Sequence, residues 1–347
     1  MKKALSFLLA LVMTVSLAAC GSSQDSASSG APAPQGSASA GGKKDFTIAT
    51  VPKLTSIAWF QRMEVGVKKY AKDTGIDAYY TGPEKGDAAL QAQTIEDLIA
   101  KGVDAICVVP FSTEALEPVL KKARDAGILV ISHEASGMKN IDYDIEAFDN
   151  EEYGRHFMDK IGELTAGKGE YIQEVGALTS ESHKQWTDSA QAYQKQKFPQ
   201  LKLFGDKIET ADDQSVSYDK VKEVLKSNPK LAAIQGSAMG DVAGAALAVE
   251  EAGLSGKVKI VGTSLVSVSG KYIKSGTIDM ISFWDPADAG YAMNVLATKL
   301  LSGEKVGDGL DLGVNGYDKL TLKDKVFYGQ AWVDVDKNNV DDPNLNF

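Results

Sequence analysis

The side chains best suited to chemistry in this sequence are a lysine, several carboxylates and a few tryptophans. Lys53 stands directly after the run "FTIATVP", and Glu134 comes just after "ILVIS". Carboxylates accept hydrogen bonds from hydroxyl groups, and a lysine ammonium donates several. Trp59, Trp186 and Trp284 offer flat apolar faces, and a few polar groups among aromatic rings are typical of small-ligand pockets. These residue types favour recognition of a small polyhydroxylated molecule.

Catalytic chemistry has little support in the sequence. The three histidines, His133, His156 and His183, show no metal-ligand spacing with a cysteine or with each other. The chain has no G-x-S-x-G elbow, no P-loop and no G-x-G-x-x-G after its first apolar run. We therefore expect no enzyme activity, no cofactor and no metal. A secreted hydrolase or sugar-modifying enzyme is the weaker alternative, because it needs a nucleophile–base pair or a metal site.

Short β-rich runs alternate with helical stretches along most of the chain. One series has its runs at 46–52, 76–82, 103–110 and 128–132, and a second series begins near Asn150. Strands that alternate with helices predict βαβ units and parallel sheets. The expected fold is therefore α/β, with two doubly wound, Rossmann-like lobes joined by a three-segment hinge.

The lobes are predicted from discontinuous segments. We expect the first lobe to contain residues 44–149 plus 265–283, and the second to contain 150–264 plus 284–347. The three crossovers are expected near Asp149, Thr263-Ser264 and Trp284-Asp285.

Ligands bind beyond the carboxyl ends of the strands in open parallel sheets. If two lobes face each other, the residues just after each strand line the cleft between them. This rule gives the candidate ligand-binding residues: Lys53, Ser56, Trp59, Phe111, His133, Glu134, Asp149, Asn150, Ser182, His183, Trp186, Ser237, Ala238, Asp241, Ser264, Trp284 and Asp285.

Several of these candidates have a simpler structural explanation. Asp149-Asn150 could cap the helix that begins near Glu151, and Trp284-Asp285 before a proline fits a turn. A histidine after a strand, such as His133, is more often structural than a ligand contact. Trp59 and Phe60 are neighbours on a helix and must point in different directions, so we predict Trp59 for the pocket and Phe60 for the core.

The first residues are typical of an export signal. Lys2 and Lys3 precede an apolar run, which ends in "LAAC" at Cys20. This end resembles the lipobox of bacterial lipoproteins, so we predict a signal peptide at 1–19 and lipidation of Cys20. Residues 21–42 contain no large apolar side chain, and we expect 20–43 to be a flexible tether.

Charge and cysteine content limit the partners. Without Lys2 and Lys3, 35 basic residues face 47 acidic ones, a net charge of −12. This negative charge argues against nucleic acid and anionic lipid surfaces as ligands. If Cys20 carries lipid, Cys107 has no disulfide partner, and its place in "AICVVP" predicts a buried structural thiol.

The order of several segments resembles a known family. "IATVPKL", "IEDLIAKGVDAICVVP", "KKARDAGILVISHE", "FDNEEYG", "KVKIVGTS" and "ISFWDPADAGYAM" are similar to type I periplasmic-type sugar-binding proteins of ABC importers, over residues 45–347. The resemblance implies a monomeric receptor that closes on a small sugar-like ligand and docks on ABC permease subunits. With the lipid anchor, it would stand outside the bacterial cell membrane. A sensor that presents its ligand to a membrane receptor is the alternative.

Within that family the chain resembles the autoinducer-2 and rhamnose binding proteins. "VPKL", Gln185-Trp186, "FWD" and "GDGLDLG" carry this likeness. It implies ligand contacts for Lys53 and for Glu134, which stands where the subgroup has an aspartate. The subgroup's Asp-Gln pair falls on Ser182-His183, and only Ala238 remains of its Pro-x-Ala stretch. A ligand of the autoinducer-2, deoxyhexose or pentose type is expected, and these departures leave its identity open.

Overall fold

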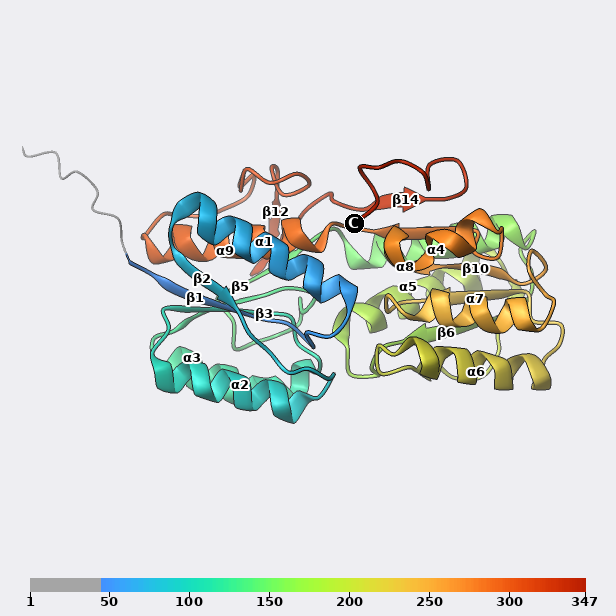
Figure 1. Ribbon diagram of the computed structural model, residues 1–347, viewed down its shortest axis with the longest axis horizontal. Helices are drawn as coiled ribbons and strands as arrows, with labels where there is room; N and C mark the ends of the chain where they lie inside the picture. Colours follow the sequence, from blue (N-terminus) through green and yellow to red (C-terminus); the bar gives the residue numbers. More distant parts are fainter. Residues whose placement is uncertain (1–44) are drawn as a thin grey trace, which may run out of the picture. The chain divides into compact units, whose positions relative to one another are not determined.

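Two seven-stranded sheets organise residues 45–347, the part of the chain that this computed structural model describes (Figure 1). The predicted signal peptide, Cys20 and the tether lie outside the described residues. The first sheet has the order β12-β13-β5-β4-β3-β1-β2, and only its edge pair, β12 with β13, is antiparallel. Its strands are β1 (Thr47–Val51), β2 (Asp77–Tyr80), β3 (Ala105–Val108), β4 (Leu129–Ser132), β5 (Tyr143–Glu146), β12 (Thr321–Lys323) and β13 (Val326–Tyr328).

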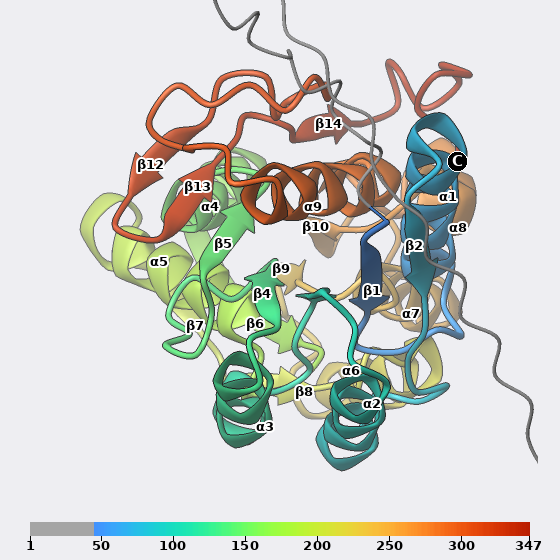
Figure 2. The ribbon, with the colours of Figure 1, turned by 90° about the vertical axis from the view of Figure 1, so that its left-hand side faces the viewer.

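Two helix pairs cover this first sheet, one on each face (Figures 1 and 2). The pairs are α1 (Ala58–Thr74) with α9 (Pro286–Leu301), and α2 (Ala88–Lys101) with α3 (Thr113–Asp125). Helices α1 and α9 approach closely because Gly66 has no side chain: a Cβ there would lie 1.9 Å from the carbonyl oxygen of Ala287. This close pairing brings the beginning of α1 next to the beginning of α9.

The second sheet has the order β14-β11-β10-β9-β6-β7, and β8 pairs with β6. Only its edge strand β14 runs antiparallel to its neighbour. Its strands are β6 (Lys168–Val175), β7 (Gln200–Leu203), β8 (Ile208–Glu209), β9 (Ala233–Gly236), β10 (Lys259–Thr263), β11 (Met280–Phe283) and β14 (Val333–Val335). Its helices are α4 (Asn150–Leu164), α5 (Glu181–Lys197), α6 (Gln214–Ser227), α7 (Asp241–Glu251) and α8 (Val266–Lys274).

The prediction of two doubly wound α/β lobes is confirmed. The alternation of β-rich and helical runs in the sequence did not predict strand β5. Its sequence, "YDIE", contains two carboxylates, Asp144 and Glu146, which are buried in the structure. Cys107 is buried in β3, as expected, has no disulfide partner within residues 45–347, and burial raises the pKa of its thiol. Among residues 45–347, no helix is both long and apolar enough to cross a membrane.

The predicted division of the late segments between the lobes is wrong. Strand β11 pairs with β10 in the second sheet, so residues 265–283 do not belong to the first lobe. Helix α9 instead packs on α1 and on strands of the first sheet, and β12 and β13 extend that sheet. The reason is topological: α8 connects two neighbouring parallel strands, β10 and β11, and therefore stays with their sheet.

Two of the three predicted crossovers are in place. The chain passes between the sheets after β5, near Asp149, and after β11, at Trp284-Asp285. The prediction for Thr263-Ser264 is wrong, because these residues lead from β10 into α8 within the second sheet. The third crossover lies at residues 329–332, between β13 and β14. Strands β13 and β14 have no helix between them, so the alternation of strands and helices in the sequence could not predict this crossover.

Candidate ligand-binding site

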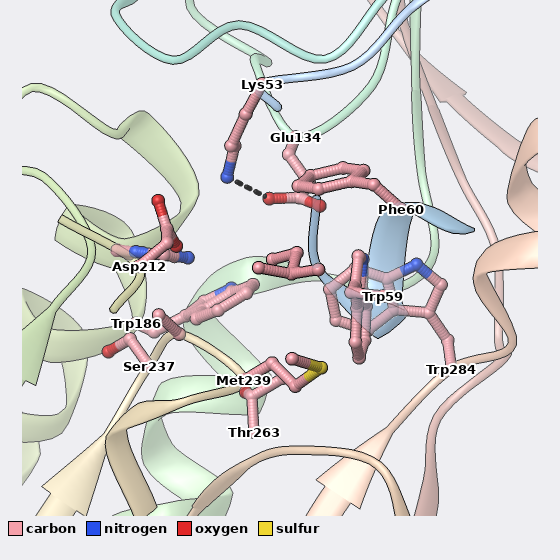
Figure 3. Close-up of a pocket in the computed structure, with 13 residues that line it drawn as sticks. Lys53, Trp59, Phe60, Glu134, Trp186, Asp212, Ser237, Met239, Thr263 and Trp284 are labelled. Atoms are coloured by element: carbon pink, nitrogen blue, oxygen red, sulfur yellow. Dashed lines mark hydrogen bonds and ion pairs between the residues drawn. The ribbon is translucent and has the colours of Figure 1, made fainter. Parts of the chain in front are cut away.

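A small pocket lies beyond the carboxyl ends of strands from both sheets (Figure 3). It contains about 300 Å³ of atom-free space, part of which is open to solvent. The pocket is formed by both lobes, which are connected by the three crossovers, and each lobe contributes side chains to it. The lining residues are Lys53, Ile57, Trp59, Phe60, Glu134, His183, Trp186, Asp212, Ser237, Ala238, Met239, Thr263 and Trp284.

A buried ion pair forms one side of the pocket. The Lys53 ammonium donates to Glu134 Oε2 over 2.7 Å, and the two residues are 3% and 4% exposed. Burial alone would raise the pKa of Glu134, but the positive charge of Lys53 holds that pKa at about 2. Burial lowers the pKa of Lys53, but the charges of Glu134, Asp212 and Glu146 and the hydrogen bond to Glu134 together outweigh it, so this pKa is raised. Both groups are therefore charged at neutral pH.

Glu134 is held in an unusual backbone conformation. Its φ is 59°, in the left-handed region that side chains other than asparagine and aspartate rarely adopt. Its Oε2 also accepts a hydrogen bond of 3.1 Å from Ser182 Oγ, at the beginning of α5. Strained residues of this kind persist where the surrounding structure fixes them, and they concentrate in ligand sites.

The second sheet supplies three polar groups to the pocket. His183 Nδ1 accepts a hydrogen bond from the Gly176 N–H, and burial lowers the pKa of His183 to about 3. The ring is therefore neutral and carries its proton on Nε2. Ser237 is 2% exposed, and its hydroxyl has no hydrogen-bond partner among the described residues. Asp212 is also buried, and burial raises its pKa.

Aromatic rings form the apolar part of the pocket. Trp59 and Trp284 meet edge to face with ring centroids 4.6 Å apart, and Trp186 lies 6.0 Å from Trp284 in the same kind of arrangement. Figure 3 shows Trp59, Trp284 and Phe60 grouped on one side of the pocket, and Asp212 and Ser237 on the other. The site therefore has one apolar edge and one polar edge.

The sequence rule found eight of the lining residues. These are Lys53, Trp59, Glu134, His183, Trp186, Ser237, Ala238 and Trp284. Nine predicted residues do not line the pocket: Ser56, Phe111, His133, Asp149, Asn150, Ser182, Asp241, Ser264 and Asp285.

Most of these nine residues hold lining residues in place. Asn150 Oδ1 accepts from Trp186 Nε1 over 2.6 Å, and His133 Nε2 accepts from Trp284 Nε1 over 3.2 Å. Ser182 donates to Glu134, and Ser264 donates to the carbonyl of Met239. Hydrogen bonds of this type fix the orientation of groups that contact a ligand.

Asp241 also belongs to this supporting set. Its Oδ2 accepts from the N–H groups of Ser237 and Ala238 over 3.0 and 2.7 Å, and its Oδ1 accepts from Thr210. The carboxylate therefore fixes the turn between β9 and α7, and both of its oxygens are occupied by hydrogen bonds within the protein.

The remaining four have other positions. Asp149 caps α4, as the simpler explanation proposed, and Asp285 caps α9 and pairs with Arg62 over 2.5 Å. Ser56 is exposed, and Phe111 packs against Gly86. The rule placed these residues at the right end of the strands without resolving which way each side chain points.

Five lining residues are absent from the candidate list: Ile57, Phe60, Asp212, Met239 and Thr263. Phe60 is buried in the hydrophobic core, as predicted, and its ring also lines the pocket. Asp212 follows β8 (Ile208–Glu209), so the same rule applied to that two-residue strand would have selected it. Ile57, Met239 and Thr263 lie within the corner segments 53–59, 237–241 and 263–264 that the rule selects, but they are not among the individual candidates.

Direct hydrogen bonds also connect the two lobes beside the pocket. Gln185 of α5 donates to Ser136 Oγ over 2.8 Å, and Lys53 reaches Ser180 Oγ at 3.5 Å. A Cβ at Gly137 would lie 2.2 Å from Glu181 Oε1, so the loop after β4 approaches α5 closely at this glycine. Among the described residues, no group of histidine, cysteine and carboxylate side chains could hold a metal ion.

Comparison with known proteins identifies the class. The periplasmic binding protein domain matches residues 48–305, and the chain therefore belongs to this family. It is 29% identical over 248 residues to the D-ribose/D-allose-binding protein of Pseudomonas aeruginosa, which covers 67% of this chain and 74% of that protein. It is 28% identical to the D-xylose-binding periplasmic protein of Escherichia coli, over 82% of this chain and 84% of the relative.

Solved structures support the same fold. A solute-binding protein of Clostridium phytofermentas with bound L-rhamnose matches with a TM-score of 0.78 at 23% identity, over 86% of this chain and 98% of that chain. The LsrB protein of Clostridium saccharobutylicum in complex with AI-2 also matches with a TM-score of 0.78, at 21% identity. This match covers 87% of the present chain and 100% of LsrB. At these identities the likeness establishes the fold of the described residues as that of a type I periplasmic binding protein.

Proposed function

We propose that this protein is an extracytoplasmic solute-binding lipoprotein. It captures a small sugar or sugar-like ligand, of the autoinducer-2, deoxyhexose or pentose type, and delivers it to an ABC importer. The observation that carries the proposal is the pocket itself. Buried polar groups and tryptophans from two lobes meet there, and the lobes are joined by three chain crossovers that could act as a hinge.

The chemistry of the pocket supports a polyhydroxylated ligand. Lys53 and the Nε2–H of His183 donate hydrogen bonds, Glu134 and Asp212 accept them, and Ser237 can do either. The tryptophans offer apolar faces to the C–H groups of a ring. Relatives named for ribose, allose and xylose, and structures with bound L-rhamnose and AI-2, fit the same ligand class.

A calorimetric screen of the purified protein tests this proposal. The panel contains L-rhamnose, D-fucose, D-galactose, D-ribose, D-xylose and autoinducer-2. We expect at least one of them to bind with release of heat and to raise the melting temperature, because a ligand that binds only the folded state stabilises it. Absence of both signals across the panel would contradict the proposed ligand class.

Replacement of Lys53 tests whether the ligand binds in this pocket or elsewhere on the protein. Lys53→Ala removes a charged donor from the pocket, and we expect it to abolish the calorimetric signal for the ligand that the screen finds. Lys85→Ala is the matched control, because Lys85 is exposed in the loop before α2 and does not line the pocket. An unchanged affinity of Lys53→Ala would exclude Lys53 from the site.

Transport requires a cellular measurement. We expect deletion of the gene to reduce uptake of the radiolabelled ligand, and expression of the wild-type protein, but not of Lys53→Ala, to restore it. Normal uptake in the deletion strain together with a lost transcriptional response to the ligand would favour the sensor alternative.

A further inference from the structure

The Asp212 carboxylate is the least satisfied charged group in the pocket. Asp212 is 8% exposed, and no hydrogen bond joins its side chain to another of the residues 45–347. A buried charge without hydrogen bonds is costly, so such a group normally has a partner. The other carboxylate of the pocket, Glu134, already accepts hydrogen bonds from Lys53 and Ser182.

The surroundings of Asp212 indicate where its partner would lie. Lys53 is close enough to influence Asp212, because the charge of each acts on the pKa of the other. Lys53 makes one short hydrogen bond, to Glu134, and a long contact of 3.5 Å with Ser180. An ammonium group can donate further hydrogen bonds. Both side chains line the same pocket, approaching it from different lobes (Figure 3).

A ligand hydroxyl group has the chemistry to bridge these two charges. Its oxygen can accept from the Lys53 ammonium while its proton is donated to Asp212, so both charged groups gain a hydrogen bond from one ligand atom. Charge-assisted hydrogen bonds of this kind are about twice as strong as neutral ones. The unpartnered hydroxyl of Ser237, also on the polar edge, could bind a second hydroxyl group of the same ligand.

The charges of the lining residues also restrict the ligand. Lys53 is the single cation among the thirteen lining residues, and it is already paired with Glu134. With Asp212 ionised, the three charged residues sum to −1, and the neutral ring of His183 does not change this. An anionic group would meet repulsion without a free cation to offset it.

We propose that Asp212 is the specificity-determining carboxylate of the second lobe, and that it binds, together with Lys53, one hydroxyl group of an uncharged ligand. This inference rests on the proposed function of the pocket and adds a residue and a ligand charge that the sequence analysis did not assign. Ligands that lack the shared hydroxyl, or that carry a carboxylate, bind much more weakly.

The neighbouring residue provides a matched control. Asp212→Asn keeps the size of the side chain and tolerates the left-handed backbone at this position, where φ is 56°. Asp213→Asn makes the same change one residue later, at the N-cap of α6, where asparagine is as good a cap as aspartate. Asp213 does not line the pocket.

Titration calorimetry of wild type and both variants, with the sugar from the panel that binds tightest, tests the inference. We expect Asp212→Asn to weaken binding at least about tenfold, as for loss of a charge-assisted hydrogen bond, and Asp213→Asn to stay within about twofold. Melting temperatures of the three ligand-free proteins check that the variants fold. A second arm compares D-galactose, D-fucose and D-galacturonate, which differ only at C6, and the acid should give no signal.

The outcomes separate the two proposals. Wild-type affinity in Asp212→Asn, or tight binding of D-galacturonate, would overturn this inference and leave the sugar receptor intact. If wild type binds no sugar of the panel, the proposed function fails, and the role of Asp212 fails with it.

Discussion

At the level of single residues, the pocket shows a division between side chains that line it and side chains that orient them. Trp186 and Trp284 present ring faces, while Asn150 and His133 hold their indole N–H groups. His133 Nδ1 is hydrogen-bonded to the carbonyl oxygen of Ile145, so the neutral ring has its Nε2 free to accept from Trp284. The indole N–H groups of Trp186 and Trp284 are thus satisfied, which fixes the orientation of these two rings.

His183 makes the stability of the folded protein depend on pH below neutrality. Burial lowers its pKa from 6.5 to about 3. Between these values the unfolded chain binds a proton that the folded protein does not, so stability falls as the pH decreases from 6.5 towards 3. Between pH 7 and pH 5, protonation of this single group in the unfolded chain should lower the free energy of unfolding by about 2 kcal/mol.

Replacement by asparagine tests this effect. In His183→Asn the side-chain oxygen can still accept from the Gly176 N–H, but the residue no longer titrates. We expect the free energy of unfolding, measured in urea at several pH values, to fall less steeply between pH 7 and 5 than in wild type. Parallel curves for the two proteins would show that His183 takes up its proton in the folded state as well.

At the level of elements, the loop after β4 and the first turns of α5 connect the two lobes. Gln185 reaches Ser136, Ser182 reaches Glu134, and the absence of a side chain at Gly137 leaves room for Glu181. These contacts do not require a ligand, because they join protein to protein. They should therefore favour the closed arrangement and contribute to affinity indirectly, since a ligand binds more weakly when its binding-competent state is less populated.

Two glutamines on one helix can separate this effect from general damage to α5. Gln185→Ala removes the 2.8 Å hydrogen bond to Ser136. Gln196→Ala makes the same change at an exposed position of α5. We expect the first to weaken ligand binding about two- to tenfold, the range for one neutral hydrogen bond, and the second to leave it unchanged. Equal affinities in calorimetry would show that the contact does not favour closure.

At the level of the whole chain, each lobe is assembled from segments far apart in the sequence. Helix α9 returns to the first lobe after β11 has completed most of the second sheet, and β14 returns to the second lobe from the end of the chain. Three crossovers result, and they are the segments in which a change of angle between the lobes would have to occur.

The proposed anchor is tested by fractionation of cells. We expect wild type in the membrane fraction and Cys20→Ala in the soluble extracytoplasmic fraction or as an unprocessed precursor, because the acyl chains would be lost. Cys107→Ala is the matched control, since this thiol is buried in the first lobe and should not affect location. Release of both variants, or normal processing and membrane retention of Cys20→Ala, would contradict lipidation at Cys20.

The sequence by itself determined the two-lobed α/β fold and the end of the strands at which the pocket lies. Both follow from local patterns: β-rich runs that alternate with helices, and polar residues that stand just after those runs. The same patterns selected Lys53, Glu134 and the three tryptophans. Residue type and position were not sufficient alone, because Phe111, Asp149, Asp241 and Asp285 also stand at such corners and do not line the pocket.

Only the tertiary structure decided which lobe each late segment joins and which way each candidate side chain points. Strand pairing assigned β11 and α9, because hydrogen bonding between distant segments leaves no local signal. Asp149, Asp241 and Asp285 stand at the expected corners, yet their carboxylates accept backbone hydrogen bonds there. Asp212 stands after a strand of two residues, too short to recognise, and only folding brings its unpartnered carboxylate opposite Lys53.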